Sequence, residues 1–154
     1  MNAKRALATL AVLTGIGWAS PASAAGPSCT ISATSVNFGN YNVFTAAPLD
    51  STGTVTYNCN DKAKNITVML SKGVSGTYSP RTMMKGAEPL SYNLYTDAAR
   101  SIVWGDGTGG TSVHSSANPP ADTNVVLTIY ARVPASQDVT AGSFSETISA
   151  VINF

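Results

Sequence analysis

The last eleven residues of the chain, Phe144–Phe154, alternate apolar and polar side chains over most of their length. This period of two is typical of a β-strand with one buried face. Glu146 interrupts that face near its start, and the apolar positions on it are Phe144, Ile148, Ala150, Ile152 and Phe154. A core strand of a sandwich has a neighbour on each side, and no further sequence follows this one. We therefore expect the domain to take a neighbouring strand from another molecule.

The first 24 residues have the pattern of a signal peptide. Lys4 and Arg5 form a basic start, Ala6–Trp18 is a short apolar run, and Ala22-Ser23-Ala24 is a cleavage site of the A-x-A type. The apolar run is too short to span a bilayer, so we expect no membrane insertion. The sequence predicts an exported protein whose single mature domain is residues 25–154.

The charge of this domain excludes some classes of partner. Without Lys4 and Arg5, seven of the nine basic residues remain against eight acidic ones, a formal charge of −1. There is no basic stripe for nucleic acid and no polybasic patch for anionic lipid. We expect neither partner.

Cys29 and Cys59 are the only cysteines of the chain. In an exported protein an even pair indicates a disulfide. The bond would join the start of the first strand to the end of the second. Those strands then either run antiparallel side by side or face each other across the core.

The rest of the chain consists of strand patterns separated by turn residues. Residues 54–59, 66–70, 90–94 and 125–133 alternate, the last most clearly. No stretch after the signal peptide has a helical period. Six to seven short strands in one domain predict an all-β, immunoglobulin-like sandwich.

The first strand changes its parity. Cys29, Ile31 and Ala33 share one face, whereas Val36 and Phe38 fall on the other. Such a switch predicts a bulge or break near Thr34.

The residues of an enzyme are missing from the sequence. His114 is the only histidine, and we expect it to be solvated in a loop. With the cysteines paired, no His/Cys cluster is left for a metal. We predict no catalytic residues, no metal site and no cofactor. Arg81 is expected to be solvated or bonded to the backbone.

An alternative function from another class is a soluble exported adhesin domain that recognises a glycan or other surface ligand. Trp104, with Tyr92, Tyr95 and Tyr130, would supply the aromatic platform. Aromatic residues in sandwiches more often pack in the core or on a face.

Several segments, in order and spacing, resemble the spore coat protein U domain family across essentially the whole predicted mature chain. They are Cys29-Thr-Ile, Val36-Asn-Phe-Gly-Asn-Tyr41, Gly53-Thr-Val-Thr-Tyr-Asn-Cys59, Arg81-Thr-Met, Leu90-Ser-Tyr-Asn-Leu-Tyr-Thr-Asp-Ala98, Trp104-Gly-Asp-Gly-Thr108 and Gly142–Phe154. Each segment is weak evidence alone.

The resemblance implies a structural subunit of a surface fibre or coat. Members include subunits of archaic chaperone–usher pili, which resemble immunoglobulin folds that lack their last strand. A periplasmic chaperone lends that strand, and a neighbouring subunit later replaces it. The implied partners are the chaperone, an outer-membrane usher and neighbouring pilin or coat subunits. The protein would pass through the periplasm to the cell surface.

The strand-accepting groove, which also binds the chaperone, is predicted beside the C-terminal strand. Its predicted residues are Ile31, Phe144, Ile148, Ala150, Ile152 and Phe154. A polymerising subunit of this type also carries a donor segment of roughly ten residues before its first cysteine. Only Ala25–Ser28 would precede Cys29 here, and Pro27 cannot donate to a β-ladder. We expect a subunit that accepts a strand but gives none from its N-terminus, and so lies at an end of any fibre.

Overall fold

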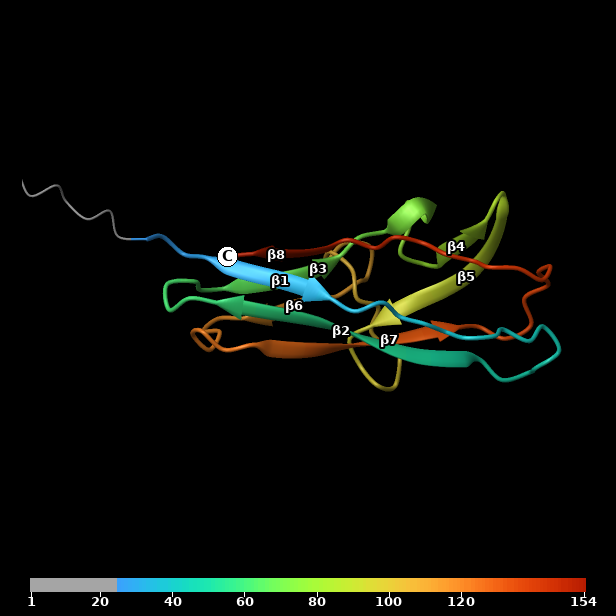
Figure 1. Cartoon of the computed structure of the whole chain (residues 1–154), viewed down its shortest axis with the longest axis horizontal. Helices are drawn as coiled ribbons and strands as arrows, with labels where there is room; N and C mark the ends of the chain where they lie inside the picture. Colours follow the sequence, from blue (N-terminus) through green and yellow to red (C-terminus); the bar gives the residue numbers. More distant parts are fainter. Residues whose placement is uncertain (1–24) are drawn as a thin grey trace, which may run out of the picture.

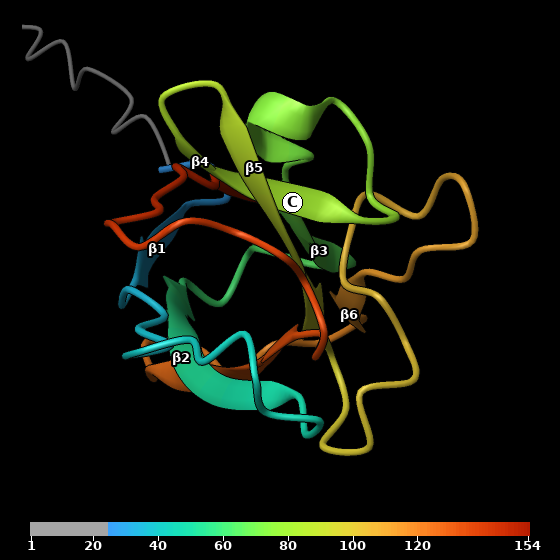
Figure 2. The same ribbon diagram turned by 90° about the vertical axis from the view of Figure 1, so that its right-hand side faces the viewer.

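The structure is a computed structural model that describes residues 25–154, so the signal peptide predicted at residues 1–24 lies outside the described part. Two antiparallel sheets pack face to face (Figures 1 and 2). The larger sheet has the order β1 (Cys29–Ala33), β2 (Leu49–Cys59), β7 (Val125–Val133), β5 (Glu88–Tyr95), β4 (Arg81–Lys85). The smaller has the order β6 (His114–Ser116), β3 (Ile66–Leu70), β8 (Ala150–Asn153).

The predicted all-β sandwich is confirmed. The described residues form eight strands rather than six or seven, since β4 and the three-residue β6 lack a clear alternation in the sequence. The only helical element among them is the 3₁₀ turn η1 (Gly73–Ser75). No helix in residues 25–154 is long and apolar enough to cross a membrane.

Strand β7 shows how the alternation becomes a core. Ile129, Ala131 and Val133 are buried toward the second sheet, whereas Val126 is 60% exposed on the other face. β2 and β3 have the same alternating burial, and their inward side chains pack together between the sheets. The period of two in these strands therefore records one buried face.

The structure contains the predicted disulfide and a break in the first strand near Thr34. Cys29 and Cys59 are bonded and lie opposite each other in the antiparallel β1–β2 pair, so the strands are side by side. β1 ends at Ala33, and Val36 then turns over Gly53 of β2. A Cβ atom at Gly53 would lie 2.8 Å from a methyl carbon of Val36, so this close approach favours glycine.

One lateral edge of the sandwich is sealed by residues 103–105. The Trp104 amide donates to the Leu94 carbonyl of β5 at 2.9 Å, and the Leu70 amide of β3 donates to the Gly105 carbonyl at 3.2 Å. The indole of Trp104 is 1% exposed, and its Nε1 donates to the Val68 carbonyl at 3.0 Å. We call this boundary the sealed edge, because backbone hydrogen bonds link residues 103–105 to both sheets.

Candidate functional site

The opposite edge of the sandwich is bordered by two extended segments that no hydrogen bond joins. The N-terminal wall, residues 33–43, continues from β1 toward β2. The C-terminal wall, residues 139–150, leads into β8. In Figure 1 these segments run along the same side of the molecule in opposite directions. We call the space between them the groove.

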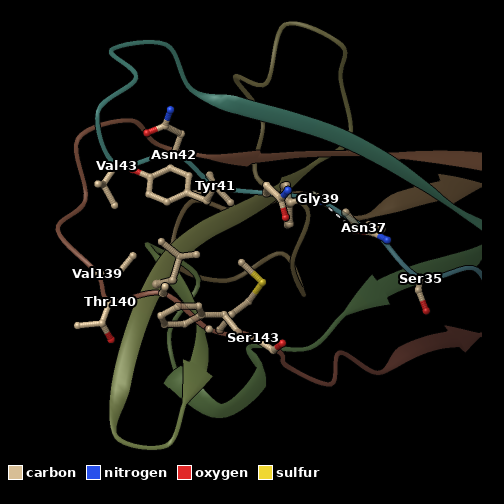
Figure 3. Close-up of a pocket in the computed structure, with 18 residues that line it drawn as sticks. Ser35, Asn37, Gly39, Tyr41, Asn42, Val43, Val139, Thr140 and Ser143 are labelled. Atoms are coloured by element: carbon tan, nitrogen blue, oxygen red, sulfur yellow. Dashed lines mark hydrogen bonds between the residues drawn. The ribbon is translucent and has the colours of Figure 1, made fainter.

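Two cavities occupy the groove. One of about 420 Å³ has Leu70, Leu94 and Ile129 of the core at its floor, with Val36 on one wall and Ile148 on the other. The second, about 760 Å³, extends to the far end of the walls. Figure 3 shows Tyr41 and Val43 on one side of this second cavity and Val139 and Thr140 on the other. The two cavities share lining residues, which are Ser35, Val36, Phe38, Met83 and Phe144.

Each wall is bonded to the sandwich along the side away from the groove. On the N-terminal wall, the Thr34 amide donates to the Thr54 carbonyl at 2.9 Å. On the C-terminal wall, Ser145 exchanges two backbone hydrogen bonds with Met84 of β4, at 3.0 and 3.1 Å. Beyond the walls, Cα atoms of β1 and β8 come within 8 Å of each other, yet no backbone hydrogen bond joins these strands in the described structure. Both borders of the groove therefore have a backbone edge without a strand partner.

The structure places five of the six residues predicted for the groove against the core. They are half-buried and contact the core cluster: Ile31, Phe144, Ile148, Ala150 and Ile152. Of these, Phe144, Ile148 and Ala150 line the smaller cavity. Phe154, the sixth, is 50% exposed after the end of β8 and lines neither cavity.

Other groove residues were not predicted from the sequence. Val36 and Phe38 line both cavities from the N-terminal wall, and Phe38 packs edge-on against Tyr92 with ring centroids 6.0 Å apart. The parity change after Ala33 is the signal that could have identified them, because it turns their side chains toward the groove. Met83 of β4 carried no such signal.

A charged cluster holds the far end of the C-terminal wall. Lys85 and Glu88, which flank the turn of the β4–β5 hairpin, form an ion pair of 2.8 Å. The Lys85 ammonium also donates to the carbonyls of Thr140 and Ala141, at 2.9 and 3.1 Å, and the Thr140 amide donates to Glu88 at 2.6 Å. Hydrogen bonds from Lys85 and then Thr140 lower the pKa of Glu88 to about 2. The wall is thus tied to the hairpin rather than to a strand across the groove.

The residues considered for other chemistry have structural surroundings. Trp104 and Tyr92 are core residues, so the proposed aromatic platform is not formed. His114 was expected to be solvated in a loop, but this expectation is wrong. It begins β6, is half-buried, and has its ring 6.0 Å from that of Tyr57. Within residues 25–154, no three His, Cys, Asp or Glu side chains gather as metal ligands.

Arg81 is bonded to the backbone, as one of the two expectations allowed, but it is fully buried rather than solvated. Its guanidinium donates to the carbonyls of Ser71 and Trp104, at 3.0 and 2.7 Å, and to Asn93 Oδ1 at 2.8 Å. The ring of Tyr78 lies 4.9 Å away. Every hydrogen-bond partner of the guanidinium lies 10 to 23 residues from Arg81 in the sequence, so the local pattern gave no signal of this buried cation.

Comparison with known proteins gives one family. The model of the Spore Coat Protein U domain matches residues 19–151. Protein U of Myxococcus xanthus is 29% identical over 132 residues, which cover 77% of this chain and 71% of that protein. A chain in the crystal structure of the CsuC–CsuE chaperone–tip adhesion subunit pre-assembly complex, from archaic chaperone-usher Csu pili of Acinetobacter baumannii, has the same fold. It aligns with a TM-score of 0.58 at 23% identity, over 83% of this chain and 40% of the solved chain.

Proposed function

The chain belongs to the Spore Coat Protein U domain family, and we propose that it is a structural subunit of a surface fibre or coat that accepts a β-strand from another protein in its groove. The supporting observation is the groove itself. It combines two backbone edges that lack partners with apolar side chains that are only half-buried. An extended segment is the ligand that satisfies both features, since its backbone pairs with an edge and alternate side chains fill the cavities.

The proposed strand donors are a periplasmic chaperone during export and a neighbouring pilin or coat subunit in the assembly. The solved structure of similar fold contains a chaperone together with a tip adhesion subunit, which supports this class of partner. An outer-membrane usher is a further proposed partner. The role is structural and needs no catalytic group, and it places the protein at the cell surface after export.

We also propose that the residues before Cys29 stay with their own domain. The Asn60 side chain donates to the Gly26 carbonyl at 2.9 Å, and the Asn60 amide donates to the Ser28 carbonyl at 2.9 Å. The Lys62 ammonium contacts the carbonyl oxygen of Ala25. If residues 1–24 are removed as the sequence predicts, these contacts favour a receiving subunit at an end of the assembly.

The proposal is tested by the effect of strand peptides on stability. We expect peptides of about ten residues with alternating apolar side chains to raise the unfolding midpoint of the purified protein. Peptides of the same composition without alternation are the control. Equal midpoints with all peptides would reject strand acceptance.

A matched pair of variants locates the binding site. Ile148→Asp places a charge on the groove face, whereas Val151→Asp places one on the outer face, where Val151 is 45% exposed. We expect the first variant to lose the stabilisation by peptide and the second to keep it. Peptide binding that tolerates Ile148→Asp would place the strand elsewhere.

A further inference from the structure

The groove contains one acidic side chain among its apolar ones. Glu146 has the same parity on the C-terminal wall as Phe144 and Ile148, and all three line the smaller cavity. A carboxylate on the apolar face of a wall is costly to cover unless it is hydrogen-bonded. The residues around Glu146 show how the protein accommodates it in the unfilled groove.

The residues around the Glu146 carboxylate supply two hydrogen-bond donors and the space that the carboxylate occupies. Its Oε1 accepts the amide of Val74 at 2.6 Å, and its Oε2 accepts the hydroxyl of Tyr92. Gly73 has a φ of +68°, and a Cβ atom there would lie 1.8 Å from Oε1. Any larger residue at position 73 would therefore displace Glu146 from this place.

Burial also keeps the phenol of Tyr92 protonated. Tyr92 is 4% exposed, and burial, followed by the hydrogen bond to Glu146, raises its pKa, so the hydroxyl remains a donor. Arg81 lies opposite Tyr92 in the β4–β5 pair, and its buried positive charge lies on the core side of the site. The negative charge of Glu146 is thus compensated from inside the domain.

The side of Glu146 that faces the groove is less complete. A carboxylate has about four acceptor positions. Val74 and Tyr92 fill two of them in the described structure, and Glu146 is half-buried, so water reaches the rest. A strand laid in the groove removes that water. An apolar side chain above Glu146 would leave acceptor positions unpaired, which is unfavourable.

We propose that the strand that occupies the groove carries a hydrogen-bond donor, a hydroxyl, amide or ammonium side chain, at the one inward position above Glu146. Apolar side chains two residues before and after it would face Ile148 and Phe144. Glu146 then determines the register of the strand, because a shift by two residues places an apolar side chain over the carboxylate. This inference rests on the proposed function and adds the chemistry of the occupant.

The test uses threonine and valine, which have nearly the same shape and differ by one hydroxyl. In a strand peptide that stabilises the protein, each inward position is made Val or Thr in turn, and affinity is measured by competition with a labelled peptide. We expect Thr to bind about tenfold more tightly than Val at a single position. At all other inward positions Val should bind more tightly.

Variants assign that preference to Glu146. In Glu146→Met combined with Tyr92→Phe, which removes both polar groups, Val should be preferred at every position. In Glu146→Gln, which is closer in shape, the preference for Thr should fall to about threefold, because a neutral acceptor forms a weaker bond. Asp97→Asn, which alters a carboxylate bonded to the amides of Ser101 and Ile102 outside the groove lining, should leave the tenfold preference unchanged.

The outcomes separate this inference from the proposed function. If no alternating peptide binds, the proposed function itself is wrong. If peptides bind but Thr is favoured at no position, the inference is wrong. It is also wrong if the preference for Thr remains tenfold in Glu146→Gln, the variant with the smallest structural change.

Discussion

The two lateral edges of the sandwich satisfy their backbone and core in different ways. At the sealed edge, residues 103–105 bond to β5 and to β3, and Trp104 and Arg81 are buried with polar partners within the chain. At the groove, no hydrogen bond joins the two walls, and their apolar side chains remain half-buried. The same sheets therefore have one edge that is complete in the isolated chain and one that invites a further strand.

The difference suggests that stability and binding are divided between the two edges. Substitutions at the sealed edge should reduce stability whether or not a strand is bound. Substitutions along the groove should matter little in the free protein and more in the complex.

Arg81→Met should be the most damaging change. It removes the donors to the carbonyls of Ser71 and Trp104 and to Asn93, and leaves these buried acceptors unpaired. We expect a loss of about 3–5 kcal/mol in the free energy of unfolding, measured with urea.

Arg132→Met is the control for loss of an arginine. Arg132 bonds Asp50 at 2.7 Å near the surface, and its removal should cost less than about 1 kcal/mol. Similar losses in the two variants would show that the buried network at the sealed edge has no special weight.

Removal of the disulfide, by Cys29→Ala with Cys59→Ala, should have the next largest effect. The bond spans a sequence separation of 30 residues, and its loss should cost about 3 kcal/mol through the entropy of the unfolded chain. β1 is bonded to β2 alone, so its amides should exchange with solvent much sooner than in the parent protein. Amides of β7, which lies between β2 and β5, are the internal control. Unchanged exchange in β1 would mean that its edge is held by something other than β2.

Two valines offer a matched comparison of the edges. Val68 is fully buried in β3, whereas Val36 is half-buried on the N-terminal wall. Val68→Ala should cost about 2–3 kcal/mol, with or without a strand peptide. Val36→Ala should cost less than about 1 kcal/mol in the free protein, and more when a peptide covers the groove. Equal costs in the free protein would contradict the division between the edges.

The accuracy of the sequence predictions follows the same division. β7 was predicted with its inward residues because nine consecutive residues keep one period. The shared face of Phe144, Ile148, Ala150 and Ile152 was predicted for the same reason, but the strand itself covers only Ala150–Asn153, and Phe154 lies exposed beyond it. β4 was missed because its inward residue at position 81 is charged, and the partners of Arg81 lie 10 to 23 residues away in the sequence.

Glu146 shows most clearly what a sequence pattern within one strand cannot predict. In the sequence it interrupts the apolar face of the last strand, whereas in the structure it keeps the inward parity and bonds Tyr92, 54 residues earlier. A pattern within one strand reports which face a residue occupies. It does not report whether another strand supplies a polar partner. Without such a partner a polar residue only interrupts the apolar face, whereas with one it can form part of a binding site.

Acidification should first destabilise the protein through His114, at the start of β6. Nε2 of His114 is buried without a hydrogen-bond partner in the described structure, and burial lowers the pKa of this imidazole below its ordinary 6.5. As the pH falls, the unfolded chain therefore binds a proton at this imidazole before the folded protein does. The free energy of unfolding is unaffected by His114 above pH 6.5 and declines as the pH falls from there through the folded pKa. His114→Gln should remove that decline from unfolding curves measured between pH 7 and 5. An unchanged decline in the variant would assign it to other groups.

Near the groove, the carboxylate of Glu88 should titrate in stronger acid than His114, and its titration should affect only the residues around it. The Glu88 carboxylate is held ionised mainly by Lys85, with a pKa of about 2 against an ordinary 4.5. Its stabilising contribution is therefore present above pH 4.5 and is lost as the pH falls through 2.

The Thr140 amide, which donates to Glu88, should follow this titration by NMR, and Lys85→Gln should move the midpoint toward 4.5. Because the pair is near the surface and holds only the end of the C-terminal wall, the change should appear at residues 139–142 while β7 stays protected. A parent midpoint already near 4.5 would show that the hairpin does not hold the wall, and the groove would then have a loose end as well as an unpaired edge.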